Sequence, residues 1–294
     1  MMLRRVHLID GNNLFHRGYF IARSMQRDAL GFILEMVGNI KRMEPSSRPV
    51  FAFDTTKSER RLALYPEYKA KRKSSMNEEE YAAFRRIYES FIDIIRKSGC
   101  TVLCGHGYEA DDFIACFTRM LKPDYRVVIV SSDSDLYQLI SSNVTVYDPI
   151  KGIHLTLDNF DNVTGIPFGH FLDFKCMVGD KSDNIPGFPG IAEKIAEQYI
   201  SAYGDYNAIH AALTEKGPLN LKKREQVLLD RDTYEFTRQL VDLSLCFSDP
   251  KLRAIIKDSV ASTVSDHKVL YDHLGSCDMT QYFALLKSLA ATNV

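Results

Sequence analysis

The sequence lacks the features that would place it in a membrane or hold it together through disulfides. No apolar run approaches the roughly 20 residues that a membrane-spanning helix needs, so we expect no membrane partner. The first residues contain no apolar segment typical of a signal peptide, which predicts a cytoplasmic location. The six cysteines include no CxxC pair and no histidine at zinc-binding spacing, which favours buried thiols over disulfides or bound zinc.

A strong charge bias is also missing. The net charge is -1, so the whole chain carries no general attraction for a polyanion. Any nucleic-acid site must therefore come from a local concentration of basic side chains. At 294 residues the chain can bury a sizeable core and is long for one compact domain, so we expect one large domain or two.

What the sequence does contain is a set of acidic residues that follow short apolar runs. Three such runs lead to Asp10, to Asp54, and to the pair Asp133 and Asp135. The runs alternate with segments of helical periodicity, which predicts an α/β fold with a mostly parallel sheet. In such sheets the ligand site lies beyond the carboxyl ends of the strands. We therefore expect these four side chains at one edge of the sheet.

A second acidic group, Glu109, Asp111 and Asp112, falls in the first turn of a helix predicted over residues 109–121. Glu109 and Asp112 are three residues apart and share a helix face. Each motif taken alone has an ordinary interpretation, because acidic residues stabilise helix N-termini and Ser-Asp-Ser-Asp is typical of a polar turn. The occurrence of several such motifs together favours a functional interpretation over the ordinary one. Crowded carboxylates repel one another unless protons or cations neutralise them, which favours a cation site.

Residues 58–73 are locally basic, with aromatic side chains interleaved. That combination suits phosphate contacts together with stacking on bases or sugars. A solvated basic loop is an equally good interpretation of the stretch taken by itself. A long amphipathic helix is predicted over residues 78–97. The aromatic and basic residues of the stretch are Arg60, Arg61, Tyr65, Tyr68, Lys69, Lys71, Arg72 and Lys73.

The stretch from Gly179 to Lys194 combines two acidic residues with a glycine-rich turn. Asp180 and Asp183 stand three residues apart, and the turn that follows leads into a helix predicted over residues 192–203. Backbone N–H groups at such a turn can approach a phosphate. An ordinary connection inside a small helical subdomain is the alternative.

As an ordered set, these motifs resemble the 5′-nucleases of the flap endonuclease superfamily. They are most similar to bacteriophage 5′–3′ exonucleases and to the N-terminal nuclease domain of bacterial DNA polymerase I. The resemblance covers roughly residues 5 to 245. The motifs are Leu-Ile-Asp10-Gly-Asn-Asn, Ala-Phe-Asp54, Tyr65-Pro-Glu-Tyr-Lys69-Ala-Lys-Arg72, Tyr108-Glu109-Ala-Asp111-Asp112, Ser132-Asp133-Ser-Asp135 and Gly179-Asp180-Lys-Ser-Asp183-Asn-Ile-Pro-Gly187-Phe-Pro-Gly190.

The resemblance implies a fold and a division of the chain. The expected architecture is an α/β, PIN-like fold, with a central, mostly parallel, twisted sheet flanked by helices. The nuclease domain would span residues 1–178 and would include a helical arch at about 57–97. A helical DNA-binding subdomain of the helix–three-turn–helix type would follow over residues 179–294.

The resemblance also implies roles for individual residues. Two metal ions are expected, with Asp10 and Asp112 acting more through water than directly, and Lys69 and Arg72 would reach the scissile phosphate. Ala192 replaces the last glycine of the family's usual turn, where a K⁺ ion is a further option. One metal site matches Asp10, Asp54, Glu109, Asp111 and Asp112; the other matches Asp133, Asp135, Asp180 and Asp183; contacts to nucleic acid match Tyr65, Tyr68, Lys71, Lys73, Gly187, Gly190, Ala192 and Lys194.

The activity implied is a structure-specific 5′-nuclease that uses two Mg²⁺ ions, or Mn²⁺ in their place. Its substrates would be DNA with 5′ flaps, overhangs, nicks or gaps, and RNA–DNA hybrids, cut to 5′-phosphate and 3′-hydroxyl ends. We expect a monomer in a bacterial or phage-infected cell, acting beside replication proteins. The absence of a polymerase domain after the matched region favours a free-standing nuclease.

Two other functions remain open at this point. One is a structure-specific DNA-binding protein with weak or lost catalysis, against which the intact acidic set argues. The other is a phosphohydrolase of small phosphate esters, which would leave the basic stretch and the glycine-rich turn unexplained.

Overall fold

The computed structural model describes residues 4–71, 76–121 and 125–290, and these fold into two compact units. Unit 1 contains residues 1–57, 74–154 and 246–294, and unit 2 contains residues 58–73 and 155–245. This division differs from the predicted boundary after residue 178. The last helices of the chain pack with the sheet, and residues 58–71 pack with the later helices of unit 2. Each unit is described by itself below.

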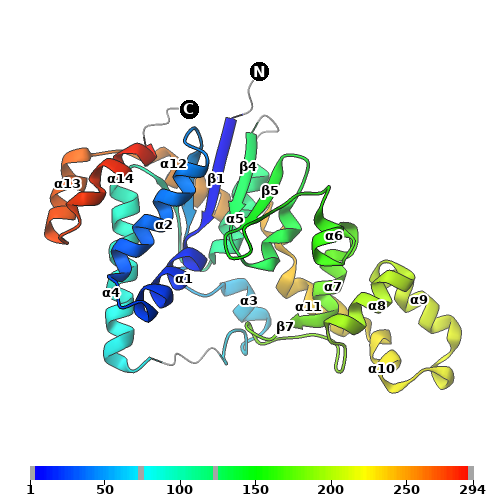
Figure 1. Ribbon diagram of the computed structural model, residues 1–294. Coiled ribbons are helices and arrows are strands. Elements are labelled where there is room, and N and C mark those ends of the chain that lie inside the picture. Colours follow the sequence, from blue (N-terminus) through cyan, green and yellow to red (C-terminus); the bar gives the residue numbers. More distant parts are fainter. Residues whose placement is uncertain (1–3, 72–75, 122–124, 291–294) are drawn as a thin grey trace. The chain divides into compact units, whose positions relative to one another are not determined.

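A six-stranded sheet forms the centre of unit 1, in the order β3-β2-β1-β4-β5-β6 (Figure 1). The pairings of β1 with β2, β1 with β4, β2 with β3, and β4 with β5 are all parallel, which confirms the mostly parallel sheet. The strands are β1 (Arg4–Asp10), β2 (Arg48–Ala52), β3 (Thr101–Leu103), β4 (Tyr125–Val130), β5 (Val144–Asp148) and β6 (Ile153–Leu155).

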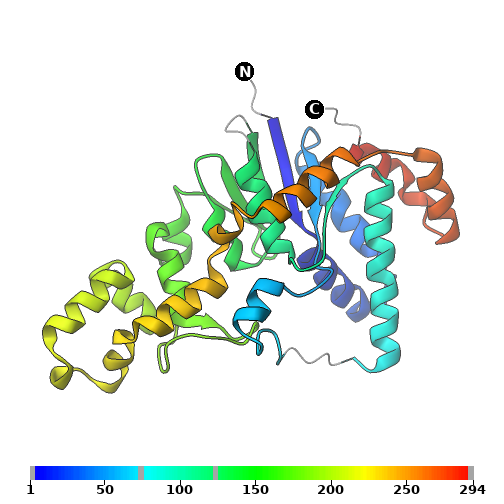
Figure 2. The same cartoon turned by 180° about the vertical axis from the view of Figure 1, so that it is seen from behind.

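Helices cover both faces of this sheet, so β1 is buried without interruption from Val6 to Asp10. Helices α5 and α12 pack together on one face, where α12 also contacts β3, and Figure 2 shows both from behind. The opposite face carries α1, α2, α4, α13 and α14 (Figure 1). The helices of unit 1 are α1 (Gly11–Ser24), α2 (Ala29–Met43), α4 (Glu78–Lys97), α5 (Ala110–Met120), α12 (Pro250–Ala261), α13 (His267–Ser276) and α14 (Phe283–Ala290), with 3₁₀ helices η1 (Ser134–Leu139) and η6 (Thr280–Tyr282).

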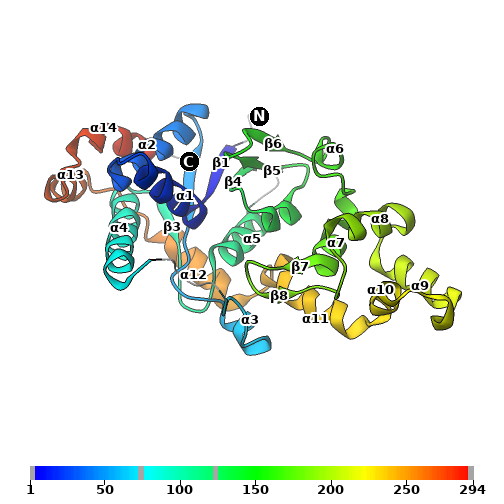
Figure 3. The same ribbon diagram turned by 60° about the horizontal axis from the view of Figure 1, so that its bottom comes forward.

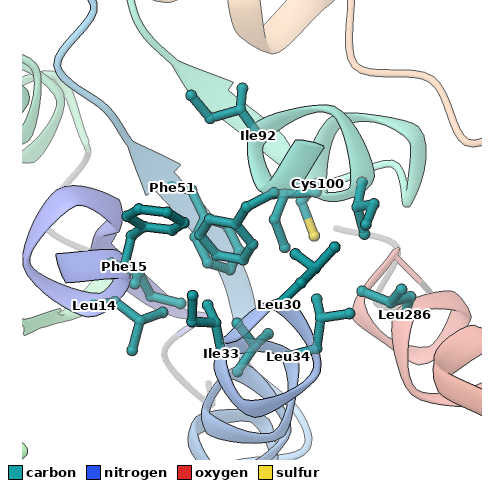
Figure 4. Close-up of a cluster of buried hydrophobic side chains, with 14 of the residues drawn as sticks. Leu14, Phe15, Leu30, Ile33, Leu34, Phe51, Ile92, Cys100 and Leu286 are labelled. Carbon is teal, nitrogen blue, oxygen red and sulfur yellow. The ribbon is translucent and has the colours of Figure 1, made fainter. Parts of the chain in front are cut away.

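The main apolar core lies between the sheet and this helical face (Figure 4). Phe15 of α1 and Phe51 of β2 are completely buried there, together with Leu286 of α14. Fully burying side chains of this size contributes about 1.5–3 kcal/mol each relative to exposure. Residues from the beginning and the end of the chain therefore share one core, which explains why α13 and α14 belong to unit 1.

The predicted helix over residues 78–97 is confirmed as α4. Asn77 caps it: its side chain accepts a hydrogen bond from the backbone N–H of Glu80, and the Glu80 carboxylate accepts one from the backbone N–H of Asn77. The buried face of α4 carries Phe84, Phe91 and Ile95. Because Phe91 and Ile95 are four residues apart on one stripe, they enter the same core.

Unit 2 is mostly helical and includes one short antiparallel hairpin of β7 and β8 (Figure 3). Within it, the basic segment is tied to α11 by the buried side chain of Arg61, whose Nε donates to the carbonyl of Leu240 at 2.9 Å. Its elements are α3 (Glu59–Leu64), α6 (Phe160–Thr164), η2 (Phe168–His170), α7 (Phe171–Val178), β7 (Gly179–Asp180), β8 (Ile185–Pro186), α8 (Glu193–Tyr203), α9 (Tyr206–Lys216), η3 (Pro218–Asn220), α10 (Lys223–Gln226), η4 (Val227–Leu229) and α11 (Arg231–Val241), and η5 (Leu243–Cys246) leads back to unit 1.

Among the residues that the structure describes, no helix combines the length and apolarity needed to span a membrane.

The pH dependence of stability should reveal the buried histidine of β1. His7 accepts or donates a hydrogen bond at Nδ1 with the Ser47 hydroxyl at 2.8 Å, and burial, aided by the charge of Lys41, lowers its pKa from 6.5 to about 4. Glu44 lies 3.7 Å from Nε2 and favours the charged ring, but burial outweighs that attraction. The unfolded chain then binds the extra proton, so stability falls as the pH drops from 6.5 toward 4. Between pH 7.5 and 5 we expect His7 to account for a loss of about 2 kcal/mol.

Urea unfolding of the wild type and of His7→Asn at both pH values measures this loss. The variant should lose less stability than the wild type on acidification, and the exposed His267→Asn should behave like the wild type. Equal losses in His7→Asn and the wild type would contradict a neutral His7.

Candidate metal centre

The carboxyl ends of three neighbouring parallel strands bring the predicted strand-end aspartates to one edge. Asp10, the last residue of β1, pairs in register with Ala52, and Ile9 pairs with Val130. Asp54 and Asp133 follow their strands by two and three residues. Strands β2 and β4 lie on opposite sides of β1, and Figure 3 shows the ends of β1 and β4 side by side. This edge is the topological switch point, the usual ligand position in open parallel sheets.

Asp10 is the buried centre of this edge and is 4% exposed. Its Oδ1 accepts the backbone N–H of Asn13 at 2.9 Å and thereby caps α1, and its Oδ2 accepts the Ser131 hydroxyl at 2.8 Å. Burial raises the pKa of Asp10 to about 7, and the negative charges of Asp133 and Asp54 add to the rise. The two hydrogen bonds lower the pKa but do not offset burial. The aspartates therefore lie close enough to repel one another.

Asp54 joins the end of β2 to the start of α5. Its Oδ1 accepts the backbone N–H of Ala110 at 2.6 Å, and its own backbone N–H donates to Oδ1 of Asn12 at 2.9 Å. Tyr88 of α4 donates to the same Asn12 oxygen and to the Asp54 carbonyl. Asp54 thus contacts side chains or backbone of three helices.

The group Glu109, Asp111 and Asp112 stands at the start of α5, as the sequence predicts. Glu109 is the N-cap residue and is 2% exposed, while Asp112 is 1% exposed. Asp112 has a structural task, because its Oδ2 accepts the backbone N–H of Glu109 at 3.0 Å and its Oδ1 accepts the Cys246 thiol at 3.1 Å. Asp111 is partly exposed. This capping arrangement places the acidic turn beside Asp54 through Ala110.

Asp133 and Asp135 are half-buried and lie at the start of η1. Asp133 Oδ1 accepts the backbone N–H of Asp135 at 2.9 Å, and the Asp133 N–H donates to the Ser131 hydroxyl at 3.0 Å. The loop is tied to α1 by Asn13, whose Oδ1 accepts the Ser132 hydroxyl at 2.9 Å. The ordinary interpretation of this stretch as a polar turn is therefore also correct, and the turn holds two carboxylates at the edge.

The other acidic pair, Asp180 and Asp183, lies on the β7–β8 hairpin of unit 2. Burial raises the pKa of Asp180, but hydrogen bonds from Ser182 and the charge of Lys175, 3.8 Å away, outweigh it and leave the pKa below its usual value. Asp183 accepts the Tyr68 hydroxyl at 3.1 Å.

Lys69 is held against this hairpin by backbone and side chain. Its N–H donates to the Asp183 carbonyl at 2.8 Å, and its Nζ lies 3.6 Å from Asp183 Oδ2. The backbone of Lys69 has a positive φ of 54°, which L-residues rarely adopt. The structure thus brings a residue predicted to act on the scissile phosphate beside a predicted metal ligand.

The donor set fits a divalent cation in its chemistry. All the acidic side chains at this edge of unit 1 supply oxygen, which Mg²⁺ and Mn²⁺ prefer. Burial raises the pKa of Asp10, and the charges of Asp133 and Asp54, which a cation would offset, add to the rise. In the described parts of the chain, however, no three or more such side chains are arranged to hold an ion. The structure therefore shows acidic residues assembled at one edge, and the ligand assignments stay predictions.

The predicted nucleic-acid contacts fall into different environments. Tyr68 is 2% exposed and packs in unit 2, 5.0 Å from Lys69 Nζ to its ring centre, so here it is part of the interior instead of a stacking surface. Tyr65 contacts Phe236 edge-to-face. Lys71 is exposed, whereas Arg72 and Lys73 lie outside the described residues, as does part of the predicted arch.

The glycine-rich turn leads into α8 as predicted, but its two glycines are needed for different physical reasons. A Cβ on Gly187 would lie 2.3 Å from the Val178 carbonyl, so packing requires a glycine there. Gly190 has a φ of 78° and open space around it. Ala192 is the N-cap residue of α8, and both Ala192 and Lys194 are exposed. The exposed half of the turn leaves backbone N–H groups at a helix N-terminus accessible.

Sequence reasoning did not identify the residues that hold the acidic edge together. Asn12, Asn13, Ser131, Tyr88 and Cys246 each hydrogen-bond an acidic residue or its loop. The sequence did offer a hint for the two asparagines, because two polar residues directly after Asp10 begin a helix that is largely buried. Tyr88 and Cys246 carried none, since each reads as an ordinary core residue.

Comparison with known families decides the relationship. The family model described as 5′–3′ exonuclease, N-terminal resolvase-like domain, matches residues 5–164, and the model described as 5′–3′ exonuclease, C-terminal SAM fold, matches residues 166–255. The chain belongs to the 5′–3′ exonuclease family. The predicted resemblance is thereby confirmed, and the two matches meet near residue 165, ahead of the predicted boundary at 178.

The relatives of this chain include a protein of similar length and much longer proteins. A 5′-3′ exonuclease of Mycoplasmopsis pulmonis is 30% identical over 243 residues, covering 81% of this chain and 80% of the relative. DNA polymerase I of Mycobacterium tuberculosis is 34% identical over 215 residues, covering 69% of this chain. The matched region spans only 23% of that polymerase.

Solved structures share the fold of this family member. The 5′-exonuclease of bacteriophage T5, determined with bound zinc, has a TM-score of 0.75 at 22% identity, covering 89% of this chain and all of the other. A complex of the T5 D15 flap endonuclease with DNA and metal ions has a TM-score of 0.71, also at 22% identity, covering 88% of this chain and 98% of the other. At this identity the likeness establishes the fold, and the predicted α/β nuclease fold is confirmed.

Removal of the Cys246 thiol tests whether Asp112 depends on it. In Cys246→Ala the buried Asp112 carboxylate loses a donor, and we expect a loss of about 1–2 kcal/mol in the free energy of unfolding, measured in urea. Cys246→Ser keeps a donor and should lose less. Cys277→Ala, at a half-exposed thiol of the same unit, serves as the control and should change little. A Cys246→Ala variant as stable as the control would show that the contact contributes nothing.

Proposed function

We propose that this chain is a structure-specific, divalent-metal-dependent 5′-nuclease that hydrolyses phosphodiesters at 5′ ends, flaps and RNA primers. The observation that carries the proposal is the acidic edge of the sheet. Asp10, Asp54 and Asp133 arrive there from three parallel strands. Burial raises the pKa of Asp10, and the charges of Asp133 and Asp54 add to the rise. Family membership supports the same reaction class.

Two divalent ions, Mg²⁺ or Mn²⁺, would supply a hydroxide nucleophile at neutral pH and stabilise the leaving oxygen. The residues that would hold the first ion are Asp54, Glu109 and Asp111, with Asp10 and Asp112 acting through water. Asp133 and Asp135 would serve the second ion, and the resemblance adds Asp180 and Asp183. Asp112 suits an indirect role because both its oxygens already accept hydrogen bonds. No side chain of this set needs to act as a nucleophile.

Lys69 and Arg72 would stabilise charge on the scissile phosphate. A fixed cation contributes most where it is already oriented before the reaction. Lys69 meets that condition, because it is buried and its backbone and Nζ are both held by Asp183. A phosphate arriving at Lys69 would compete with Asp183 for Nζ, which links substrate binding to the freedom of that carboxylate.

The exposed turn at Gly190 and Ala192, with Lys194, would hold duplex backbone without reading sequence. A K⁺ ion at this turn is part of the proposal. Basic side chains near residue 71 would contact the single strand, although the packed Tyr68 contributes little surface to it.

The substrates proposed are DNA with flaps, overhangs, nicks or gaps, and RNA–DNA hybrids. We further propose a monomer that acts in the cytoplasm beside replication proteins and leaves 5′-phosphate and 3′-hydroxyl ends.

Cleavage of a 5′-end-labelled flap duplex tests the activity and its substrate together. We expect cutting near the flap junction with Mg²⁺ or Mn²⁺ and none with chelator. Asp133→Asn should reduce the rate about 100-fold or more, because it removes a charged ligand while an oxygen remains to accept the Asp135 N–H. Asp158→Asn, at an exposed position of unit 2, is the control for removal of a negative charge.

The alternatives predict different outcomes of this experiment. Tight binding of the flap without cutting in either metal would favour a DNA-binding protein without catalysis. Hydrolysis of a small chromogenic phosphate ester, with the flap left intact, would favour the phosphohydrolase.

Lys69→Ala should slow the chemical step more than it weakens DNA binding. We expect the single-turnover rate constant for cleavage to fall about 100-fold, while the Kd for the flap, measured in Ca²⁺, changes less than about threefold. Lys71→Ala, an exposed neighbour with the same charge, should show the reverse pattern, with a weaker Kd and little change in that rate constant. Equal losses of the cleavage rate constant and of affinity in Lys69→Ala would leave Lys69 a simple DNA contact.

A further inference from the structure

One side chain of α4 reaches the acidic edge. The hydroxyl of Tyr88 lies 2.5 Å from Oδ1 of Asn12 and 3.0 Å from the carbonyl oxygen of Asp54, and it donates its hydrogen to this pair of acceptors. The backbone N–H of Asp54 donates to the same Asn12 oxygen at 2.9 Å. Since a backbone N–H can only donate, the Asn12 side chain must present its oxygen here and not its amide nitrogen. The three groups form one closed set of contacts.

The packing of the Tyr88 ring does not account for the presence of a hydroxyl group at this position. It packs edge-to-face on Phe15 at 4.8 Å between ring centres and on Phe53 at 5.9 Å, contacts that phenylalanine would make equally well. Tyr88 is half-buried, and a hydroxyl held against aromatic rings costs free energy unless it is hydrogen-bonded. A tyrosine hydroxyl is protonated at neutral pH, so it can donate to both acceptors.

Asp54 needs such support because it lies beyond the sheet. The last backbone ladder contact of its strand is made by Phe53, whose N–H donates to the Leu103 carbonyl at 2.9 Å. Asp54 is then fixed at three points: its carbonyl by Tyr88, its N–H by Asn12, and its carboxylate by the N–H of Ala110. Two of these three anchors come from side chains, on α4 and α1.

We propose that Tyr88 and Asn12 are positioning residues for Asp54 and that they couple the long helix α4 to the candidate metal centre. Side chains that orient metal ligands from behind typically change metal affinity or activity by about 10- to 100-fold when they are removed. The inference rests on the proposed function, because it assigns Asp54 to a metal ion. It extends that function by making the placement of α4 a determinant of how well the ion is held.

The test removes only the hydroxyl, with Tyr88→Phe in the full chain. Mn²⁺ binding to the metal-free protein, followed by electron paramagnetic resonance, should weaken about tenfold. In flap cleavage with Mg²⁺, kcat should fall about tenfold with KM unchanged, since Asp54 does not contact the duplex in this scheme. Tyr81→Phe is the matched control, because Tyr81 is on the same helix and is 46% exposed. It should leave both quantities unchanged.

A second variant checks that the two residues act through one set of contacts. Asn12→Ala should weaken Mn²⁺ binding at least as much as Tyr88→Phe, and the double variant should lose less than the product of the two single losses. Independent, multiplying losses would show that Tyr88 and Asn12 do not act together on Asp54.

Other outcomes separate this inference from the proposed function. If Tyr88→Phe lowers the melting temperature but matches Tyr81→Phe in Mn²⁺ affinity and kcat, the hydroxyl is only structural and the inference is overturned. A rise in KM with kcat unchanged would also overturn it, in favour of a DNA contact. A wild type that binds Mn²⁺ without cutting any flap would contradict the nuclease, while the Mn²⁺ affinities would still decide the role of Tyr88. A wild type that binds no Mn²⁺ would overturn both.

Discussion

Burial of a carboxylate beside two others at the end of β1 is the constraint on which the polar structure of this part of unit 1 depends. Burial there raises the pKa of Asp10 to about 7, and the neighbouring charges of Asp133 and Asp54 add to the rise. Burying one acidic group beside two others is unfavourable for folding at neutral pH unless a proton or a cation compensates. A fold that keeps such a cluster must hold it in place with other interactions, and those interactions account for much of the polar structure in this region.

The supporting interactions come from several elements around the edge. Asn13 and Ser131 bind Asp10, Cys246 binds Asp112, and Tyr88 and Asn12 fix the backbone of Asp54. Several of these groups also perform ordinary structural tasks such as capping α1 or α5. The hydrogen bonds that cap the helices therefore also fix the acidic side chains, because a carboxylate that receives a backbone N–H loses much of its freedom to rotate.

In unit 2, Asp183 likewise makes several contacts at once. This residue accepts the Tyr68 hydroxyl, pairs with Lys69 and binds the Lys69 backbone through its carbonyl. Residues from the basic segment and from the hairpin are thereby locked together across more than a hundred positions of sequence. The segment that the sequence presented as a loop of basic and aromatic residues is in part the interior of a small helical unit, which is why Tyr68 is buried.

The sequence by itself determined the fold class, most helices and the acidic residues at the edge. Apolar runs ending at Asp10 and Asp54 were sufficient, because parallel strands covered by helices must be apolar throughout and must end at a common rim. The helix over residues 78–97 followed from its periodicity, which is local. Tertiary structure alone decided that the last helices return to the sheet, that Tyr88 and Cys246 serve the acidic edge, and that Tyr68 faces inward. These outcomes depend on contacts between residues far apart in the chain, and a core tyrosine or cysteine carries no local signal of which distant polar group it will meet.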